Sequence, residues 1–229
     1  MIVTVHLWGV PAHALPCAVW HMAADRAPLR RTPGLRFAKL LGTGRGRTFT
    51  PLDADPTRWG LLAVWDDDVA ATAFAGSRLA GRWGRMAHEE WTARLRPLSA
   101  RGRWSRKEPF GDPRHGPWEG PVAAVTRARL APRRAVRFWR AVHPVAADLH
   151  GAPGLRLALG IGEAPIGLQG TLSVWNSSSE LNAFAYERPA HAAVVARTVR
   201  EGWYAEELFA RFGVLSARGT VDGVDPLRC

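Results

Sequence analysis

Two similar stretches, PGLRFAKLLGTG at residues 33–44 and PGLRLALGIGEA at residues 153–164, decide the fold of this chain. They lie 120 positions apart. Two further pairs follow in the same order: LLAVWDDDVAATAFA (61–75) with TLSVWNSSSELNAFA (171–185), and PLSARG (97–102) with VLSARG (214–219). A period of this length is too long for a solenoid and indicates a duplicated domain.

Each copy predicts the order strand, helix, strand, strand, helix, strand. In the first copy the strands are IVTVHLW, GLRFAKLLG, WGLLAVW and RPLSARGRW. One helix covers LPCAVWHMAADR, and a second helical stretch begins at DDDVAATAF and continues through RWGRMAHEEWTARL. The second copy repeats the order, with helices at PRRAVRFWRAVH (132–143) and from Ser177 to about Glu201. This is the ferredoxin-like βαββαβ pattern. We therefore predict an α+β fold in which two tandem ferredoxin-like repeats form a dimeric-α/β-barrel-type sandwich within one chain.

The predicted boundaries follow composition. Residues 1–107 form the N-terminal repeat, and residues 120–229 form the C-terminal repeat. Residues 108–119, rich in Pro, Gly and charge, form the linker between them. The glycines of GTGRGRTF (42–49) are expected in a hairpin turn and not in a nucleotide loop, because FTPLDADP follows where a phosphate-binding helix would have to begin.

The charge is strongly basic, with a net charge of +11 and a pI of about 11.2. This fits arginine-rich codon composition, or attraction to anionic lipid or an acidic protein partner. No nucleic-acid module is present, so nucleic acid is not the expected partner. The helix at 132–143 places Arg133, Arg137 and Arg140 on one face, as a solvated surface or as a docking face for acidic lipid or an electron-transfer partner.

No apolar run approaches the ~20 residues of a transmembrane helix, and no secretory signal is recognisable. The two cysteines, Cys17 and Cys229, are expected to be reduced. We expect a cytoplasmic protein, with peripheral association with an acidic membrane as an alternative. No nucleophile motif or metal cage is recognisable.

One insertion breaks the symmetry of the copies. The segment YERPAHA (186–192) has no counterpart in the first copy. Pro189 suits a helix start, which would place His191 in the first turn, where the helix dipole favours a neutral imidazole. A neutral His beside an apolar pocket is what an axial haem ligand requires, although a lone His is more often structural. Trp65 and Trp175 recur at the same repeat position and would suit a substrate pocket for a flat apolar ligand, or the core.

The stretches APLRRTPGLRFAKLLGTGRGRTFTP, SVWNSSSELNAFA, HAAVVARTVREGWYAEELFARF and SARG together resemble the spheroidene monooxygenase (carotenoid ketolase) family over nearly the whole chain. The resemblance implies a haem-dependent monooxygenase that uses haem b, O2 and electrons from reduced ferredoxin to oxidise an apolar small molecule. It supports His191 as the axial ligand in a haem-binding C-terminal half, and draws attention to Lys39 as a candidate catalytic residue. Arg197 and Arg200, on the expected helix of His191, are candidates for binding the haem propionates.

The substrate is left open, because Ala38, Ile166 and Gly167 depart from the pattern expected of the carotenoid enzymes. Two alternatives stand beside oxygenation. One is a haem enzyme that dehydrates or rearranges a nitrogen-containing substrate. The other is a barrel that binds an apolar ligand without catalysis.

Overall fold

The computed structural model describes residues 1–47, 53–113, 116–130, 148–163, 170–187 and 204–228. The strands are β1 (Ile2–Gly9), β2 (Leu35–Gly44), β3 (Ala54–Trp65), β4 (Glu89–Gly102), β5 (Val122–Leu130), β6 (Leu155–Gly162), β7 (Gly170–Trp175) and β8 (Tyr204–Gly219). The α-helices are α1 (Leu15–Ala24), α2 (Arg26–Arg30), α3 (Asp68–Ala75), α4 (Arg78–Met86) and α6 (Ser178–Asn182). A 3₁₀ turn (Ala12–Ala14) precedes α1, and a π-helical turn (Ala183–Glu187) follows α6.

The eight strands close into one antiparallel barrel in the order β1-β3-β2-β6-β7-β5-β8-β4. Within each half the order is the same, β4-β1-β3-β2 and β8-β5-β7-β6. The halves join at two seams, β2 with β6 and β4 with β8. At the first seam Gly42 pairs with Gly162, its own counterpart in the other half. The predicted mixed α/β architecture is confirmed, and its two sheets share both edges instead of facing each other as separate layers.

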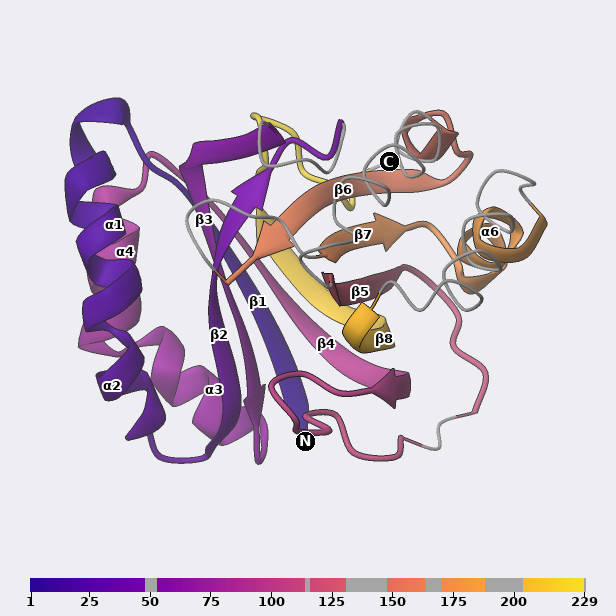
Figure 1. The fold of residues 1–229 in the computed structure, drawn as a ribbon, viewed down its shortest axis with the longest axis horizontal. Helices are drawn as coiled ribbons and strands as arrows, with labels where there is room; N and C mark the ends of the chain where they lie inside the picture. The colour runs from indigo at the N-terminus through magenta and orange to yellow at the C-terminus, as the bar shows by residue number, and fades with distance from the viewer. Residues whose placement is uncertain (48–52, 114–115, 131–147, 164–169, 188–203, 229) are drawn as a thin grey trace.

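Side-chain alternation divides the core into three parts. The barrel interior contains alternate residues of every strand, such as Val3, Val5 and Leu7 of β1. A second cluster lies between the N-terminal sheet and helices α1 to α4, which cover one side of the barrel. A third, smaller cluster lies beneath α6 on the other side (Figure 1).

Local signals explain the helix starts. Asp67 accepts a hydrogen bond of 2.8 Å from the backbone N–H of Ala70 at the start of α3, and Ser177 caps α6 through the N–H of Glu180. None of the described helices is both long and apolar enough to cross a bilayer.

The predicted helix over EEWTARL is wrong, because α4 ends at Met86 and β4 begins at Glu89. Trp91, Ala93 and Leu95 alternate into the barrel interior with period two, which a strand satisfies and a helix does not. The helix expected at 132–143 and most of the one expected to reach Glu201 lie outside the described residues.

The segment between β4 and β5 belongs partly to the core. Phe110, in the predicted linker, is 1% exposed and packs edge-on against Phe212 of β8, with ring centroids 4.9 Å apart. Trp104 is equally buried and contacts Phe37. These aromatic side chains extend the barrel core beyond the strands.

Candidate functional site at one end of the barrel

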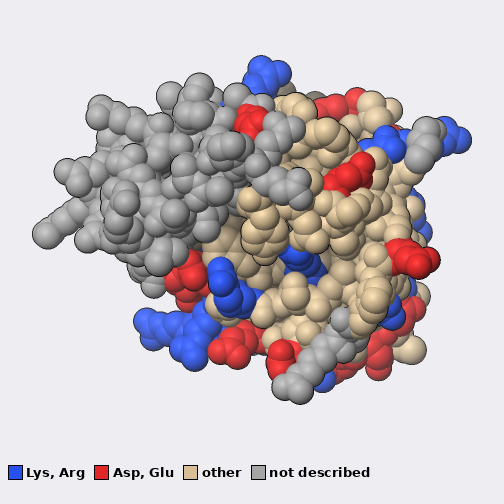
Figure 2. Space-filling model, turned by 90° about the vertical axis from the view of Figure 1, so that its right-hand side faces the viewer, with Lys and Arg blue, Asp and Glu red and all other residues tan. Residues whose placement is uncertain are grey.

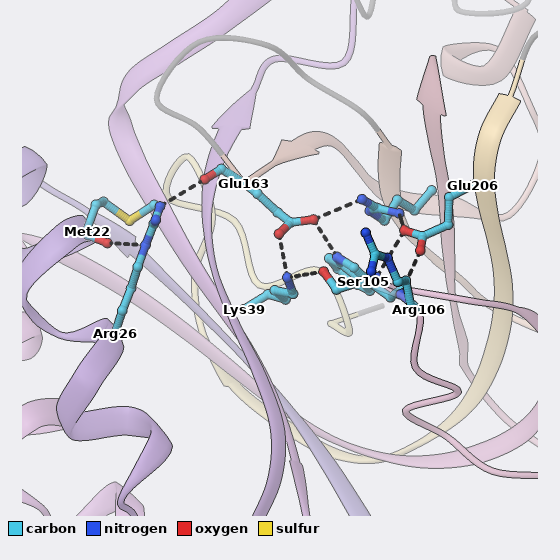
Figure 3. A network of polar contacts seen from close by, with 9 residues as sticks. Met22, Arg26, Lys39, Ser105, Arg106, Glu163 and Glu206 are labelled. Carbon is cyan, nitrogen blue, oxygen red and sulfur yellow. Dashed lines mark hydrogen bonds and ion pairs between the residues drawn. The ribbon is translucent and has the colours of Figure 1, made fainter. Parts of the chain in front are cut away.

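Four charged side chains from four strands or strand ends meet at one end of the barrel. Lys39 comes from β2, Arg127 from β5 and Glu206 from β8, while Glu163 follows the last residue of β6. Figure 3 shows Lys39 and Glu163 facing each other, with Glu206 farther along the same network. We call these four residues the barrel-end cluster. It holds two cations and two carboxylates and is neutral as a whole.

The Glu163 carboxylate is at its centre. Its Oε2 accepts a hydrogen bond of 2.5 Å from Lys39 Nζ, and its Oε1 accepts bonds from Trp104 Nε1 (2.7 Å) and Arg127 Nη2 (3.0 Å). Burial alone would raise the pKa of Glu163. The hydrogen bonds from Lys39 and Trp104 and the charges of Lys39 and Arg127 outweigh burial, so the pKa lies below its ordinary value. Glu163 is therefore ionised at neutral pH.

Arg127 connects this carboxylate to Glu206. Its side chain is 5% exposed, and its Nη1 donates to Glu206 Oε1 at 2.6 Å. The guanidinium also lies over the Trp104 ring, 5.3 Å from the centroid. A cation this deeply buried is stable here because two carboxylates and an aromatic face surround it.

Glu206 also fixes a turn. It accepts hydrogen bonds from the backbone N–H groups of Ser105 (3.0 Å) and Arg106 (2.7 Å), which have positive φ angles of 54° and 63°. Burial opposes ionisation, but these bonds and Arg127 lower the pKa of Glu206 overall. The carboxylate thus offsets the cost of a left-handed backbone in two residues that are not glycine.

Lys39 is the predicted site residue that the structure brings into this cluster. Its ammonium donates to Glu163 and, at 2.6 Å, to Ser105 Oγ. An ammonium has three N–H donors and no acceptor, so Lys39 retains one donor for another partner. Its side chain is 18% exposed, which leaves it within reach of solvent. Chemically, Lys39 can donate a hydrogen bond here.

Residues at the matching positions of the other half lie at the opposite end of the barrel, and a comparison with them shows which contacts occur at this end alone. Glu89 is the counterpart of Glu206 and binds the equivalent turn through Gly223 N (2.7 Å) and Asp222 N (3.0 Å). This turn contact is shared and is structural. The other members have apolar or uncharged counterparts: Leu159 for Lys39, Leu7 for Arg127 and Thr43 for Glu163. Their neighbour Trp104 has the counterpart Val221. Only one end therefore carries the Lys39–Glu163–Arg127 arrangement.

Sequence analysis missed Arg127, Glu163, Glu206 and Trp104. For Arg127 the repeat carried a usable signal, because a charged residue in one copy stands where the other copy has an apolar one. Arg127 against Leu7 is the clearest case, since the alternation of β1 and β5 turns both side chains into the barrel.

Trp65 and Trp175 occupy matching positions outside the barrel. Both are at most 1% exposed, and each packs on the matching phenylalanine, Phe74 or Phe184, at 5.0 and 5.3 Å. Trp65 Nε1 donates to Thr4 Oγ1. Neither lines the cavity inside the barrel, which is apolar and about 10 Å³. That volume holds about one water molecule, so the described barrel interior is a packed core. A substrate pocket beside the two tryptophans remains a prediction.

The two sheets differ on the face turned away from the barrel. In the N-terminal half, one row across β1, β3 and β2 consists of His6, Leu61 and Leu40. The matching row across β5, β7 and β6 consists of Thr126, Thr171 and Gly160. Nearby, Ala128 stands where the first half has Trp8. On strands β5, β7 and β6 the described outer face therefore carries smaller side chains, whereas on β8 Phe209 continues the row where the first half has Thr92.

His191, Arg197 and Arg200 lie outside the described residues. Among the residues that the structure describes, no three His, Cys, Asp or Glu side chains gather in a metal-binding group.

These features define a single-chain mixed α/β protein with a closed eight-stranded antiparallel barrel. The chain is 36% identical over 220 residues to a spheroidene monooxygenase of Rhodobacter capsulatus, covering 93% of this chain and 90% of that protein. It is 42% identical over 202 residues to a spheroidene monooxygenase of Rubrivivax gelatinosus, covering 87% and 77%. The chain belongs to the spheroidene monooxygenase family and is an oxidoreductase of the monooxygenase class.

No family model matches the chain. Among solved structures, an aldoxime dehydratase aligns with a TM-score of 0.59 at 10% identity, covering 93% of this chain and 80% of that one. An aldoxime dehydratase in complex with butyraldoxime aligns with a TM-score of 0.56 at 12% identity. Likeness at this identity concerns the fold alone.

Proposed function

We propose that this protein is a haem-dependent monooxygenase that oxidises a carotenoid with O2 and electrons from a reduced ferredoxin. The observation that carries the proposal is identity of 36–42% along most of the chain to proteins named spheroidene monooxygenase. The carotenoid substrate is taken from that name. Haem b and ferredoxin are taken from the family resemblance of the sequence.

We place the haem on the outer face of the C-terminal sheet, and the small side chains there support this proposal. The row of Thr126, Thr171 and Gly160 has smaller side chains than the matching row of His6, Leu61 and Leu40 in the N-terminal half. His191 would supply the axial imidazole, and Arg197 and Arg200 would bind the propionates. When bound, haem iron supplies oxygen activation. Trp175, on the same outer face, would line the apolar part of the substrate pocket.

For the barrel-end cluster we propose a positioning role. Lys39, ion-paired with Glu163, would hold the end of β6 against β2 and keep one N–H donor for a polar group near the cluster. In addition, Arg26 of α2 donates to the backbone oxygen of Glu163 at 3.3 Å, which connects the cluster to the helical layer (Figure 3).

We also propose that the barrel is a tandem duplication, a single-chain form of a dimeric α/β barrel, with repeats at 1–107 and 120–229 joined by a linker at 108–119. The identical strand order in the two halves supports this, as does the pairing of Gly42 with Gly162.

The test is turnover with defined components. Purified protein reconstituted with haem is mixed with spheroidene in detergent micelles, a reduced ferredoxin system and ¹⁸O₂. We expect a Soret band, consumption of reductant and one labelled oxygen atom in the product. His191→Ala should abolish the Soret band, whereas His13→Ala, a change at an exposed histidine, should retain it.

Other outcomes separate the rival functions. Turnover of an aldoxime without O2 or reductant would replace monooxygenation with dehydration. Tight carotenoid binding with neither Soret band nor turnover would leave a ligand-binding barrel.

A further inference from the structure

Helix α1 exposes an apolar surface on the outside of the helical layer. We call it the α1 face and define it by its exposed residues Pro16, Cys17, Val19, Trp20, Ala23 and Ala27, the last in α2. Trp20 is 68% exposed and Val19 is 46% exposed. Most of the other described tryptophans are at most 2% exposed: Trp8, Trp59, Trp65, Trp83, Trp91, Trp104 and Trp175. Trp20 therefore contributes little to the core, and its exposure needs another explanation.

The charges around the α1 face have one sign. Between Ala12 and Arg31 the one acidic residue is Asp25, which is 2% exposed and is bound by Arg82 and Trp83 of α4. Those contacts hold α4 beside the junction of α1 and α2. The exposed cations of these helices include Arg30, Arg31, Arg78 and Arg85. These four arginines form no ion pair with any carboxylate among the described residues.

Other parts of the surface do not share this pattern. On the described part of the face opposite the helical layer, acidic and basic side chains are interspersed (Figure 2). On α3 the exposed Val69 follows Asp67 and Asp68 directly, so acidic groups flank that apolar residue. Among the residues that the structure describes, exposed tryptophan, small apolar residues and unpaired arginines occur together on the α1 face.

We infer that the α1 face docks on an anionic lipid bilayer. An interfacial helix places Trp and aliphatic residues at the level of the headgroups, and flanking arginines attract anionic lipid. The inference is independent of the proposed function, although an enzyme for an apolar polyene would gain access to a substrate dissolved in the membrane.

The charge and composition of the α1 face also disfavour two other binding partners, a second copy of the chain and nucleic acid. A symmetric contact with a second copy would bring the same arginines of both copies together, and like charges repel. Nucleic acid is bound by basic side chains at the centre of the contact, whereas the centre here is Val19, Trp20 and Ala23. Sequence analysis read residues 132–143 as a solvated surface or as a docking face for acidic lipid or an electron-transfer partner. The structure does not describe those residues, and α1 is a different helix.

The experiment is flotation of the purified full-length protein with vesicles of phosphatidylcholine and phosphatidylglycerol, compared with phosphatidylcholine alone. We expect binding to the mixed vesicles that weakens with salt. Trp20→Ser should lower the partition coefficient by about tenfold, because the variant loses most of the aromatic surface that would contact the bilayer. Arg30→Gln with Arg31→Gln should lower it by about fivefold per arginine. The matched control Val69→Ser removes a more exposed apolar residue and should change nothing.

Cys17 lies within the α1 face and provides a local signal. In Cys229→Ser protein, Cys17 is the single cysteine of the sequence and can carry an environment-sensitive fluorophore. Mixed vesicles should shift its emission to the blue. The inference is overturned if the label does not respond, if Val69→Ser weakens binding as much as Trp20→Ser, or if Trp20→Ser converts a dimer in solution into a monomer.

Discussion

Gly102 and Gly219 end β4 and β8 at equivalent positions, and both have φ of +92°. A Cβ on Gly102 would overlap the carbonyl oxygen of Glu207, and a Cβ on Gly219 would overlap that of Glu90. Each glycine therefore lets the chain turn out of its strand at a point where a backbone carbonyl oxygen of the paired strand leaves no space for a side chain. The same steric reason accounts for the glycine that ends SARG in both halves.

Gly102→Ala and Gly219→Ala should each lower the free energy of unfolding by more than about 2 kcal/mol, because both the positive φ and the overlap oppose a methyl group. Gly111→Ala is the matched control. Gly111 also has a positive φ of 63°, but a methyl group there would meet no other atom within 4 Å, so a loss of about 1 kcal/mol is expected. Urea unfolding of the three variants checks the ranking, and equal losses would contradict the steric explanation.

Glu163→Gln tests the barrel-end cluster. The amide keeps an acceptor for Trp104 but removes the charge that Lys39 and Arg127 share. We expect a loss of about 1–3 kcal/mol in unfolding free energy at neutral pH, since Glu206 still compensates Arg127. The reference is Asp66→Asn, which breaks the more exposed pair with Arg36 and should cost less than about 0.5 kcal/mol.

The pH dependence of Glu163→Gln has a definite sign. A carboxylate with a lowered folded pKa stabilises the protein above its unfolded pKa, and this contribution is lost as pH falls through the folded value. The variant lacks the contribution, so its stability should fall less steeply than that of the wild type below about pH 4.5. Parallel curves in urea titrations would show that the ion pair contributes nothing.

The lowered pKa of His6 predicts a second change of unfolding free energy with pH, at higher pH than that of Glu163. Burial, followed by the charges of Arg218 and Arg94, lowers its pKa to about 4. Between that value and about pH 6.5 the unfolded chain binds a proton that the folded protein refuses, so stability falls as the pH is lowered. From about pH 7 to about pH 5 the loss from this group is about 2 kcal/mol.

His6→Gln cannot titrate and should remove that part of the slope while keeping a partner for Thr92. The control is His13→Gln, since His13 is exposed. Urea unfolding at the two pH values measures the difference. An unchanged slope in His6→Gln would mean that His6 takes up its proton in the folded state as readily as in the unfolded chain.

The sequence predicted the mixed α/β architecture because apolar alternation and turn residues are local signals and their order is the same in both halves. It could not predict the strand that begins at Glu89, where EEWTARL has residues acceptable to a helix and only barrel closure selects the alternating pattern. It also could not bring Lys39 to Glu163, which are 124 residues apart. That contact depends on the seam between β2 and β6, and single-sequence patterns do not contain strand partners.

The small residues on the outer face of the C-terminal sheet lead to a prediction about haem binding. Gly160→Leu and Thr171→Leu copy the residues of the N-terminal half, Leu40 and Leu61, into the matching row. If haem lies on this face, the added side chains occupy its place, and titration followed at the Soret band should show haem affinity reduced by about tenfold or more. The fold should persist, because the N-terminal half accommodates the same pair.

Thr92→Leu is the control, since it makes the same replacement on the outer face of β4. Haem titration followed by absorbance, with far-ultraviolet circular dichroism of each variant, separates loss of haem from loss of fold. Wild-type haem affinity in Gly160→Leu with Thr171→Leu would exclude this face as the binding surface and move the search to another part of the barrel. Such a result would leave the membership in the monooxygenase family unchanged, because that rests on the sequence comparison.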